Sequence, residues 1–291
     1  MTPAGQPGPE AGRERGRDPG PASGDGTRLR IVGYNVRDLL GDRDALAHVV
    51  RVCDPDILCL QEAPRRLWSL WRTARLARET GLRQVTGGRG SGGTAVLVHP
   101  RLDVVAKEQG RLPVAHWWTR TRGYALARLR LPHGADVAVC SLHLPLHADE
   151  RVEHIKRVRA RLEALAGGSI IVSADLNEAP GGPSWTAFDD LCRDAVEVSR
   201  DDAVEAHRPD VRDLPTYPAR APRHRIDGVL VSPGVRVLAL RPAGADDGLT
   251  ADDLVAASDH LPLVADLAVV SAGRPRTNRF VAGSPSDNRA M

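Results

Sequence analysis

Eight polar residues of the kinds that hold a cation or move a proton stand at the ends of six apolar segments of this chain. Segments such as LRIVGYN, ILCLQE and SIIVSADLN have the length and the Val, Ile and Leu content of β-strands. The polar residues are Asn35, Glu62, His143, Asp175, Asn177, Asp227, Asp259 and His260. Their oxygens suit a hard divalent cation, and their carboxylates and imidazoles can transfer protons, which is the chemistry of phosphoester hydrolysis.

Asp175 and Asn177 are separated by one residue, so on an extended segment their side chains point the same way. Such an Asp can hold or deprotonate an attacking water, and such an Asn can donate to a phosphoryl oxygen without adding negative charge. An ordinary turn is the alternative for this tripeptide. Glu62 directly follows a predicted strand, where it could be a ligand of a divalent cation. A solvated acid at the end of a strand is the alternative.

Two histidines accompany acidic residues in this set. Asp259 and His260 are adjacent, so one can orient a partner while the other faces a substrate. In a second pair, Asp227 would orient His143 and make it basic enough to protonate a leaving oxygen near neutral pH. A hydrogen-bonded structural histidine is the alternative at each position.

Strands and helices are interspersed along the part of the chain that must position these residues. The predicted strands are 28–35, 57–61, 94–99, 124–131, 136–142, 169–173, 226–232, 235–240 and 262–269. The predicted helices are 42–53, 64–80, 149–166 and 184–191, and the predicted loops around the pocket are 83–93, 108–122, 199–224 and 241–257. Two adjacent pairs of strands look like hairpins, which a purely parallel sheet would not contain. We therefore expect an α/β (α+β) fold with at least two mixed sheets and helices on the outside.

The two ends of the 291-residue chain differ in composition from its centre. Residues 1–27 and 271–291 are rich in Gly, Pro, Ser and charged side chains, so they bury too little apolar surface to offset their ordering entropy. We predict disordered tails there and a single domain over residues 28–270, about 240 residues long.

Composition limits the function further. The net charge of +3, from 40 Lys and Arg against 37 Asp and Glu, does not by itself indicate a nucleic-acid-binding domain. The N-terminus lacks the apolar stretch of a secretory signal, and no segment approaches the ~20 apolar residues of a membrane span. None of the four cysteines lies in a C-x-x-C pair, so reduced, buried thiols are expected. We expect a cytoplasmic monomer without stable membrane insertion.

In their order and context, the motifs resemble the endonuclease/exonuclease/phosphatase superfamily, which has the fold of deoxyribonuclease I. The matching segments are Tyr34-Asn35-Val36, Leu60-Gln61-Glu62, Ser141-Leu142-His143-Leu144, Ala174-Asp175-Leu176-Asn177, Arg225-Ile226-Asp227 and Ser258-Asp259-His260-Leu261-Pro262. Pro215-Thr216-Tyr217-Pro218 is similar to the small bacterial-type members. The resemblance implies a four-layer α/β sandwich, in which two mixed sheets pack face to face between helices and the site lies at one rim.

The resemblance also implies a metal site and a nucleophile. Asn35 and Glu62 match residues that hold the divalent metal, the Asn often indirectly, and Asp259 matches a residue that contributes to the metal site or orients His260. The implied metal is Mg²⁺, with Mn²⁺ as a possible substitute. Asp175 matches the residue that positions or activates the attacking water.

The remaining matches concern the phosphate. Asn177 and His260 match residues that bind the scissile phosphate, and His143 matches a phosphate ligand or general acid backed by Asp227. Arg122 resembles a phosphate-contacting Arg of the family, with a solvated arginine as the alternative. Gly228 stands where many members have Tyr, so the packing below the site is expected to differ.

The leading hypothesis is therefore a metal-dependent phosphoesterase in which water attacks in line. A nuclease acting on nucleic acid is favoured over an enzyme acting on phospholipid or inositol phosphate. Ser141-Leu142-His143-Leu144 replaces a Tyr-containing motif of exonuclease III-type repair enzymes, which disfavours abasic-site repair. A catalytically idle binding module on the same fold is the alternative from another functional class.

Overall fold

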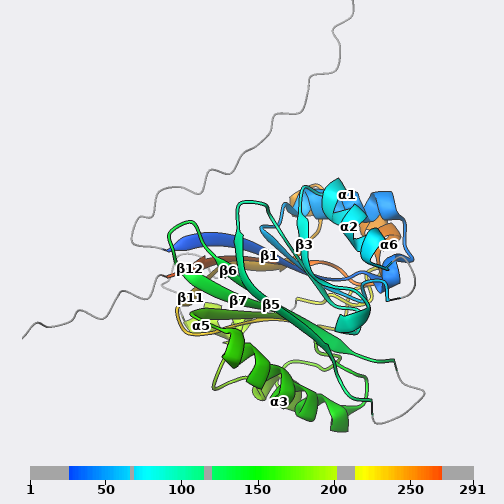
Figure 1. Cartoon of the computed structure of the whole chain (residues 1–291). Coiled ribbons are helices and arrows are strands. Elements are labelled where there is room, and N and C mark those ends of the chain that lie inside the picture. The colour runs from blue at the N-terminus through cyan, green and yellow to red at the C-terminus, as the bar shows by residue number, and fades with distance from the viewer. Residues whose placement is uncertain (1–25, 66–68, 115–119, 202–213, 271–291) are drawn as a thin grey trace, which may run out of the picture.

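Two six-stranded sheets lie face to face between outer layers of helices (Figure 1). This computed structural model describes residues 26–65, 69–114, 120–201 and 214–270. The four-layer sandwich of mixed sheets expected from the sequence is therefore confirmed. The predicted disordered tails fall outside the described residues, except that Gly26 and Thr27 are described and Thr27 begins the first strand.

The first sheet has the strand order β11-β12-β1-β2-β4-β3. Its strands are β1 (Thr27–Asn35), β2 (Ile57–Gln61), β3 (Arg83–Gly87), β4 (Ala95–Val98), β11 (Val235–Pro242) and β12 (Leu263–Val269). The second sheet has the order β5-β6-β7-β8-β10-β9. Its strands are β5 (Asp103–Arg111), β6 (Gly123–Arg130), β7 (Asp136–His143), β8 (Ser169–Asp175), β9 (Arg193–Asp194) and β10 (Asp227–Val231). Each sheet has one parallel pair at its centre, β1 with β2 and β7 with β8, and its other neighbours are antiparallel.

Helices cover the outer face of each sheet (Figure 1). The first sheet is covered by α1 (Arg43–Cys53), α2 (Ser69–Glu79) and α6 (Ala251–Ala257), and the second by α3 (Ala148–Leu165) and α4 (Pro183–Thr186). Helix α5 (Ala195–Asp201) contacts β9, β10 and β11 at the edge of the sandwich, and the 3-10 turns are η1 (Arg37–Leu39), η2 (Arg89–Ser91) and η3 (Ala245–Asp247). Asp42 caps α1, because its carboxylate accepts from the amides of Asp44 and Ala45.

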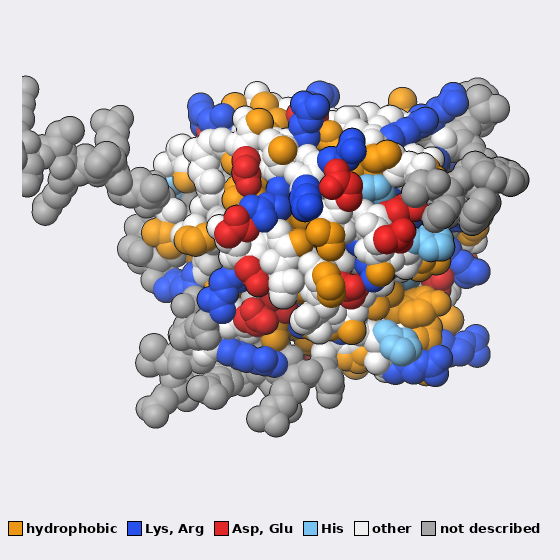
Figure 2. Space-filling view, turned by 90° about the horizontal axis from the view of Figure 1, so that it is seen from below, with side chains coloured by type: hydrophobic (Ala, Val, Ile, Leu, Met, Phe, Trp, Pro, Cys, Tyr) orange, Lys and Arg blue, Asp and Glu red, His pale blue; other side chains and the backbone are white. Residues whose placement is uncertain are grey.

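The face on the α3 side carries acidic and basic side chains next to one another (Figure 2). On it Arg157 lies 3.3 Å from Glu153, and Arg159 lies 2.6 Å from Asp190. Charges of both signs therefore alternate there, as on an ordinary solvated surface.

Several predicted elements were wrong, and the errors share a cause. Strand β3 lies in the predicted loop 83–93, most of β5 precedes the predicted loop 108–122, and α6 lies in the predicted loop 241–257. These elements are short or lie at a sheet edge with many exposed residues, so their apolar periodicity is weak. The start of the predicted helix 64–80 lies partly outside the described residues, and the predicted helix 184–191 is a single turn, α4.

One predicted hairpin is also wrong. β6 and β7 are joined by the expected turn, but β10 and β11 belong to different sheets. The chain crosses between the sheets at Pro233-Gly234, where Gly234 has a φ of 90°. Spacing along the chain is the same for a hairpin and for a crossing of this kind, so the sequence pattern did not distinguish them.

The apolar core between the sheets gives way to polar contacts near one rim. The Nε2 atom of Gln61 donates to the Ser141 hydroxyl at 3.2 Å and to the Ser173 carbonyl at 3.3 Å. The Ser141 hydroxyl in turn donates to the Leu60 carbonyl at 2.8 Å. These buried bonds run from the first sheet to the second, so they fix how the two rims face each other.

Gly33 tests this close approach of the sheets. A Cβ at Gly33 would stand 2.3 Å from the Ser173 hydroxyl oxygen but 3.7 Å from the Ser173 Cβ. Gly33→Ala should therefore destabilise the protein by about 1–3 kcal/mol in urea unfolding, because a well-packed core resists an added methyl group. Adding Ser173→Ala should recover most of that loss. Additive effects of the two substitutions would contradict the contact.

Candidate active site

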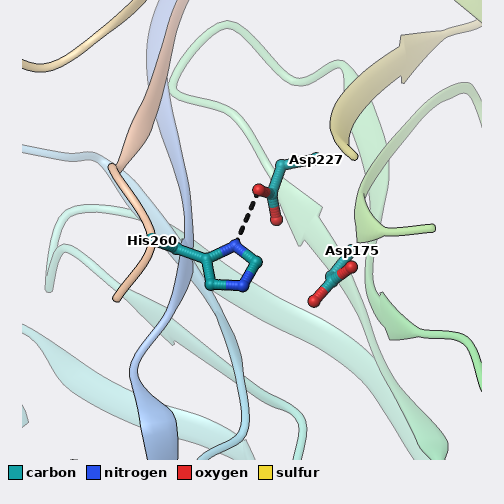
Figure 3. Close-up of side chains that lie close together, drawn as sticks. All are labelled: Asp175, Asp227 and His260. Atoms are coloured by element: carbon teal, nitrogen blue, oxygen red, sulfur yellow. Dashed lines mark hydrogen bonds and ion pairs between the residues drawn. The ribbon is translucent and has the colours of Figure 1, made fainter. Parts of the chain in front are cut away.

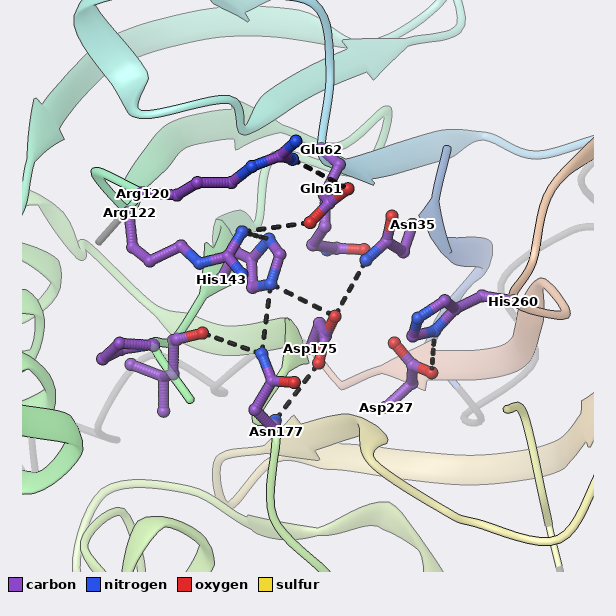
Figure 4. Close-up of polar contacts among 12 residues, drawn as sticks. Asn35, Gln61, Glu62, Arg120, Arg122, His143, Asp175, Asn177, Asp227 and His260 are labelled. Carbon is purple, nitrogen blue, oxygen red and sulfur yellow. Dashed lines mark hydrogen bonds and ion pairs between the residues drawn. The ribbon is translucent and has the colours of Figure 1, made fainter. Parts of the chain in front are cut away.

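Seven of the eight residues singled out in the sequence lie together at one rim of the sandwich (Figure 4), and the eighth, Asp259, directly precedes His260. Parallel β1 and β2 place Asn35 beside Gln61, and β7, β8 and β10 place His143, Asp175 and Asp227 on three neighbouring strands. Asp259 and His260 enter from the segment before β12, which runs antiparallel to β1. Strand direction thus brings together residues that are as much as 225 positions apart in the chain.

A hydrogen bond between the two sheets holds Asp175. The amide nitrogen of Asn35, at the end of β1, donates to Asp175 Oδ2 at 2.9 Å, and both side chains are buried. The other carboxylate oxygen, Oδ1, accepts from the Asn177 backbone amide at 3.1 Å. The side-chain amide of Asn177 donates to the Leu144 carbonyl at 2.9 Å, so Asn177 has a fixed orientation beside Asp175.

A second bond between the sheets joins Asp227 and His260 (Figure 3). His260 Nδ1 lies 2.9 Å from Asp227 Oδ2, and the Thr216 hydroxyl donates to the same oxygen at 2.5 Å. The Tyr217 ring lies against the imidazole with a centroid separation of 4.8 Å. Asp227, and not Asp259, is therefore the residue that orients His260.

The predicted pairing of His143 with Asp227 is wrong. His143 and Asp227 both pair in register with Asp175, from opposite sides of β8. Their backbones are therefore two strand spacings apart, about 9.6 Å. Arg122 Nη1 lies 3.1 Å from His143 Nδ1, and Nε2 lies 3.3 Å from Asp175 Oδ2 and 3.2 Å from the Asn177 amide nitrogen. An arginine can only donate, so Nδ1 is the acceptor and Nε2 carries the hydrogen that points to Asp175.

The two histidines have opposite electrostatic environments. Burial and the nearby Arg122 guanidinium hold the pKa of His143 well below its usual range, so this imidazole is neutral. Burial also opposes charge on His260, but the carboxylates of Asp227 and Asp175 outweigh it and raise the pKa to about 9. His260 is therefore a cation at neutral pH, and His143 is a neutral hydrogen-bond donor.

The same cluster perturbs Asp175. Burial and the negative charge of Asp227 raise the pKa of Asp175 to about 6, and the positive charge of His260 limits the rise. Asp175 is thus ionised above pH 6 while remaining basic for a carboxylate. A buried carboxylate with such a pKa can accept a proton from water near neutral pH.

Glu62 and Asp259 lie at the more open side of the site, each beside arginines. Arg122 Nη1 donates to Glu62 Oε1 at 3.1 Å, and Arg120 lies 3.7 Å from the other Glu62 oxygen. Arg37 lies 3.7 Å from Asp259. The side chains of Glu62 and Asp259 are 17% and 38% exposed, so both can offer an oxygen to a solvated cation.

The backbone around these side chains is unusual. Among the described residues other than glycine, positive φ occurs at Asp54, which caps α1, and at Arg37, Asp38, Leu39, Glu62 and Asn177. Glu62 directly follows the end of strand β2, and Asn177 stands two residues after the end of strand β8. Left-handed backbone in such residues costs about 1–3 kcal/mol each and tends to persist at functional sites.

One cluster of donors among the described residues could hold a metal ion. Asp175, Asp227 and His260 offer ligand atoms that all lie within 4.8 Å of one another and could bind one. A protonated His260 cannot be a ligand, however, since Nδ1 already pairs with Asp227 and the other nitrogen would also carry hydrogen. Asn35 and Glu62, which the sequence analysis named as metal ligands, lie at the same rim, and their oxygens are of the kind that a hard cation prefers (Figure 4).

Some residues in the site had no role in the sequence analysis. Thr216 holds Asp227, and Arg37 and Arg120 accompany the open carboxylates. No local pattern marks such residues, because their partners come from distant parts of the chain. The expected difference at Gly228 has a physical basis, since a Cβ there would stand 2.6 Å from the Trp185 ring, which occupies that space.

Residues 32–260 match the model of the Endonuclease/Exonuclease/phosphatase family. The chain belongs to this family. The match covers every motif residue described above, from Asn35 to His260. No curated protein matches the chain significantly.

Solved structures of other family members share its fold. An endonuclease/exonuclease/phosphatase from Bacteroides vulgatus has 17% identity and a TM-score of 0.66, with 84% of this chain and 99% of that chain covered. A mannosyl-6-phosphatase from Bacteroides thetaiotaomicron has 20% identity and a TM-score of 0.61, with 82% and 99% covered. The human Nocturnin catalytic domain with bound sulfate has 17% identity and a TM-score of 0.59, with 83% and 93% covered. No helix in the described part of this family member is long and apolar enough to cross a membrane.

The Asp227–His260 pair predicts a pH-dependent contribution to stability. The pKa of His260 rises from an ordinary 6.5 to about 9, so its protonation stabilises the fold fully below pH 6.5 and the contribution is lost as the pH rises through about 9. Asp227→Asn should bring the pKa of His260 down from about 9, measured by NMR titration of the metal-free protein. Asp190→Asn, on the α3 side, is the matched control, and an unchanged pKa in the Asp227 variant would contradict the pairing.

Proposed function

We propose that the protein is a Mg²⁺-dependent phosphoesterase that hydrolyses a phosphodiester or phosphomonoester by in-line attack of water. One observation carries the proposal. A basic, ionised Asp175 lies near a cationic His260 in a buried site (Figures 3 and 4). The carboxylates of Glu62 and of Asp259, which precedes His260 in the chain, are more exposed. A proton acceptor, a fixed positive charge and oxygen donors for a cation are the parts that this reaction requires.

Each side chain has a distinct task in this proposal. Asp175 orients the attacking water and accepts its proton, while the neutral His143 donates to Asp175 and keeps the carboxylate in place. His260, charged and held by Asp227, stabilises the negative charge that develops on the phosphoryl oxygens. The side-chain amide of Asn177 supplies a neutral donor to the same oxygens. These assignments make His260, rather than His143, the cationic residue of the reaction.

The metal ligands in this proposal are Glu62 and Asp259, with Asn35 contributing through its amide oxygen. Mg²⁺, or Mn²⁺ in its place, would supply positive charge that offsets the charge of the phosphate and of the entering oxygen. Arg122 and Arg120 lie against Glu62 and are the nearest side chains for a phosphate oxygen once that carboxylate holds a cation.

For the substrate we propose a nucleic acid, in preference to a phospholipid or an inositol phosphate. Arginines at Arg37, Arg65, Arg120 and Arg122 surround the site and suit a chain of phosphates. Structural relatives named as a mannosyl-6-phosphatase and as TDP2 from Caenorhabditis elegans show why fold alone cannot choose the substrate. We further propose a cytoplasmic monomer. A catalytically idle module is less well supported, because every predicted site residue is present at one rim.

Hydrolysis should depend on both the metal and Asp175. The test panel is plasmid DNA, single-stranded DNA, RNA, sphingomyelin, inositol phosphates and bis-p-nitrophenyl phosphate, each with Mg²⁺, Mn²⁺ or EDTA. Asp175→Asn should lower the rate by ~10² or more, because it removes the proton acceptor while retaining the side chain's shape. Equal turnover by Asp175→Asn and the unchanged protein would exclude the proposed mechanism, whereas Asp190→Asn should match the unchanged protein.

The position of the metal can be tested without turnover. Glu62→Gln should weaken Mn²⁺ binding by about 10-fold or more in calorimetry, because it replaces a carboxylate ligand by a neutral amide. Glu153→Gln, on the exposed face of α3, is the control and should bind as the unchanged protein does. If His260→Gln weakened binding and Glu62→Gln did not, the ion would lie in the Asp175–Asp227–His260 cluster instead.

The rate should also fall at high pH. His260 has a pKa of about 9, so its charge and the rate should decline as the pH rises through that value. Asp227→Asn should move this decline to lower pH, because it removes the carboxylate that stabilises the charged imidazole. A decline that stays at the same pH in the variant would assign it to another group.

A further inference from the structure

A groove beside the site has no role in the reaction described above. It has a volume of about 620 Å³ and lies between the segment after η1 and helix α2. Its described lining residues are Leu39, Gly41, Arg43, Trp71, Arg72 and Arg75. This volume falls within the range of about 300–1,000 Å³ that is usual for pockets that bind small ligands or parts of larger ones.

The groove exposes apolar and aromatic surface. Trp71 is 52% exposed, and Leu40, which stands between the lining residues Leu39 and Gly41, is 69% exposed. Two large apolar side chains at such exposure beside one groove favour a binding site over ordinary surface composition. A flat ring offers a stacking surface to any nucleobase, since every base has a π-face.

The same groove is positively charged. Arg43, Arg72 and Arg75 line it, and no carboxylate is among the described lining residues. Glu79 lies 2.7 Å from Arg75 and 3.7 Å from Arg43, and Asp44 lies 3.6 Å from Arg43, so these two carboxylates offset part of the charge. Arg75 also lies over the Trp71 ring at 5.5 Å. An arginine next to an aromatic ring is the combination that binds the phosphates and bases of single strands.

The left-handed turn η1 links the groove to the site along the chain. Leu39 lines the groove and accepts from Arg72 at 2.6 Å, whereas Arg37, two residues earlier, lies 3.7 Å from Asp259. The backbone amide of Asp38 donates to the Glu62 carbonyl at 2.6 Å. Arg37 and Leu39 are two residues apart, so their Cα atoms lie within about 7.6 Å of each other, and the groove begins close to the contact between Arg37 and Asp259.

We propose that this groove binds an unpaired nucleotide next to the scissile phosphate, with the base against Trp71 and the phosphates against the three arginines. The substrate would then be single-stranded nucleic acid, or a strand whose end is unpaired. The inference rests on the proposed phosphoesterase function and specifies its substrate class. A membrane surface is disfavoured, because the site is concave and its arginines lie inside the concavity rather than around it.

The test measures binding, so it does not depend on turnover. Binding to the Asp175→Asn protein with Mg²⁺ is measured by fluorescence anisotropy. The ligands are a labelled dT decamer and a series of the same decamer in which each position in turn lacks its base. Trp71→Ala should weaken binding of dT by about 5-fold to 100-fold, the usual effect of losing one stacked base. When Trp71 is present, removing the base at one position should weaken binding by the same factor. In the Trp71→Ala protein, removing that base should leave the affinity unchanged. A residue with a merely structural role would not show this coupling.

Charge is tested separately through salt. Arg43→Ala should reduce the slope of log affinity against log salt by about 0.7, as expected for one phosphate contact to a single strand. Arg157→Ala, an exposed arginine on α3, removes the same charge from the opposite layer and should leave the slope unchanged. Thermal melting of every variant confirms that it is folded before binding is measured.

The outcomes separate the two proposals. Base-independent binding, or equal affinity of Trp71→Ala and the parent, would overturn the groove assignment while metal-dependent hydrolysis lost in Asp175→Asn still stood. Trp71-dependent binding to phosphatidylserine vesicles, with none to the decamer, would also overturn it and would identify a lipid surface. Base-coupled binding without hydrolysis of any substrate would support the groove and refute the phosphoesterase.

Discussion

Two hydrogen bonds between the sheets hold the residues of the candidate site in place. Each bond can form only if the two sheets are at a particular distance from each other. Asn35 reaches from the first sheet to Asp175 in the second, and His260 reaches from the segment before β12 to Asp227. All four side chains are buried, so loss of either bond would leave polar groups without water. The apolar core and the contacts of Gln61 set the separation, which makes the packing of the sandwich a condition of the site's geometry.

Charge in the site is arranged so that few groups are left alone. The buried carboxylates of Asp175 and Asp227 repel each other, and the His260 cation between them reduces that repulsion. His143 stays neutral because its burial disfavours a charge and because Arg122 already supplies positive charge beside it, so its pKa is lowered. The two imidazoles of the site thus have different protonation states at neutral pH. His143 can therefore act as a neutral hydrogen-bond donor, and His260 as a fixed cation.

The sequence was sufficient for most central strands and singled out residues that meet at one rim, but it did not predict how those residues pair. Strong apolar runs predicted β1, β2 and β7, and strand ends identified Asp175 among the site residues. Edge strand β5 and short helix α6 were missed, because exposed elements lack a clear apolar period. The partner of Asp227 depends on which strand lies between it and each histidine, and that order is a property of the assembled sheets.

The left-handed turn after β1 shows how the rim and the groove depend on each other. Arg37, Asp38 and Leu39 all have positive φ, a costly conformation for residues with side chains. Several contacts hold this turn. The Asp38 amide donates to the Glu62 carbonyl, and the Asp38 carboxylate forms ion pairs with Arg120 and Arg65. Arg72 donates to the Leu39 carbonyl. Because Arg37 lies beside Asp259 and Leu39 lines the groove with Trp71, a change in the turn would move a residue of the site and a residue of the groove together.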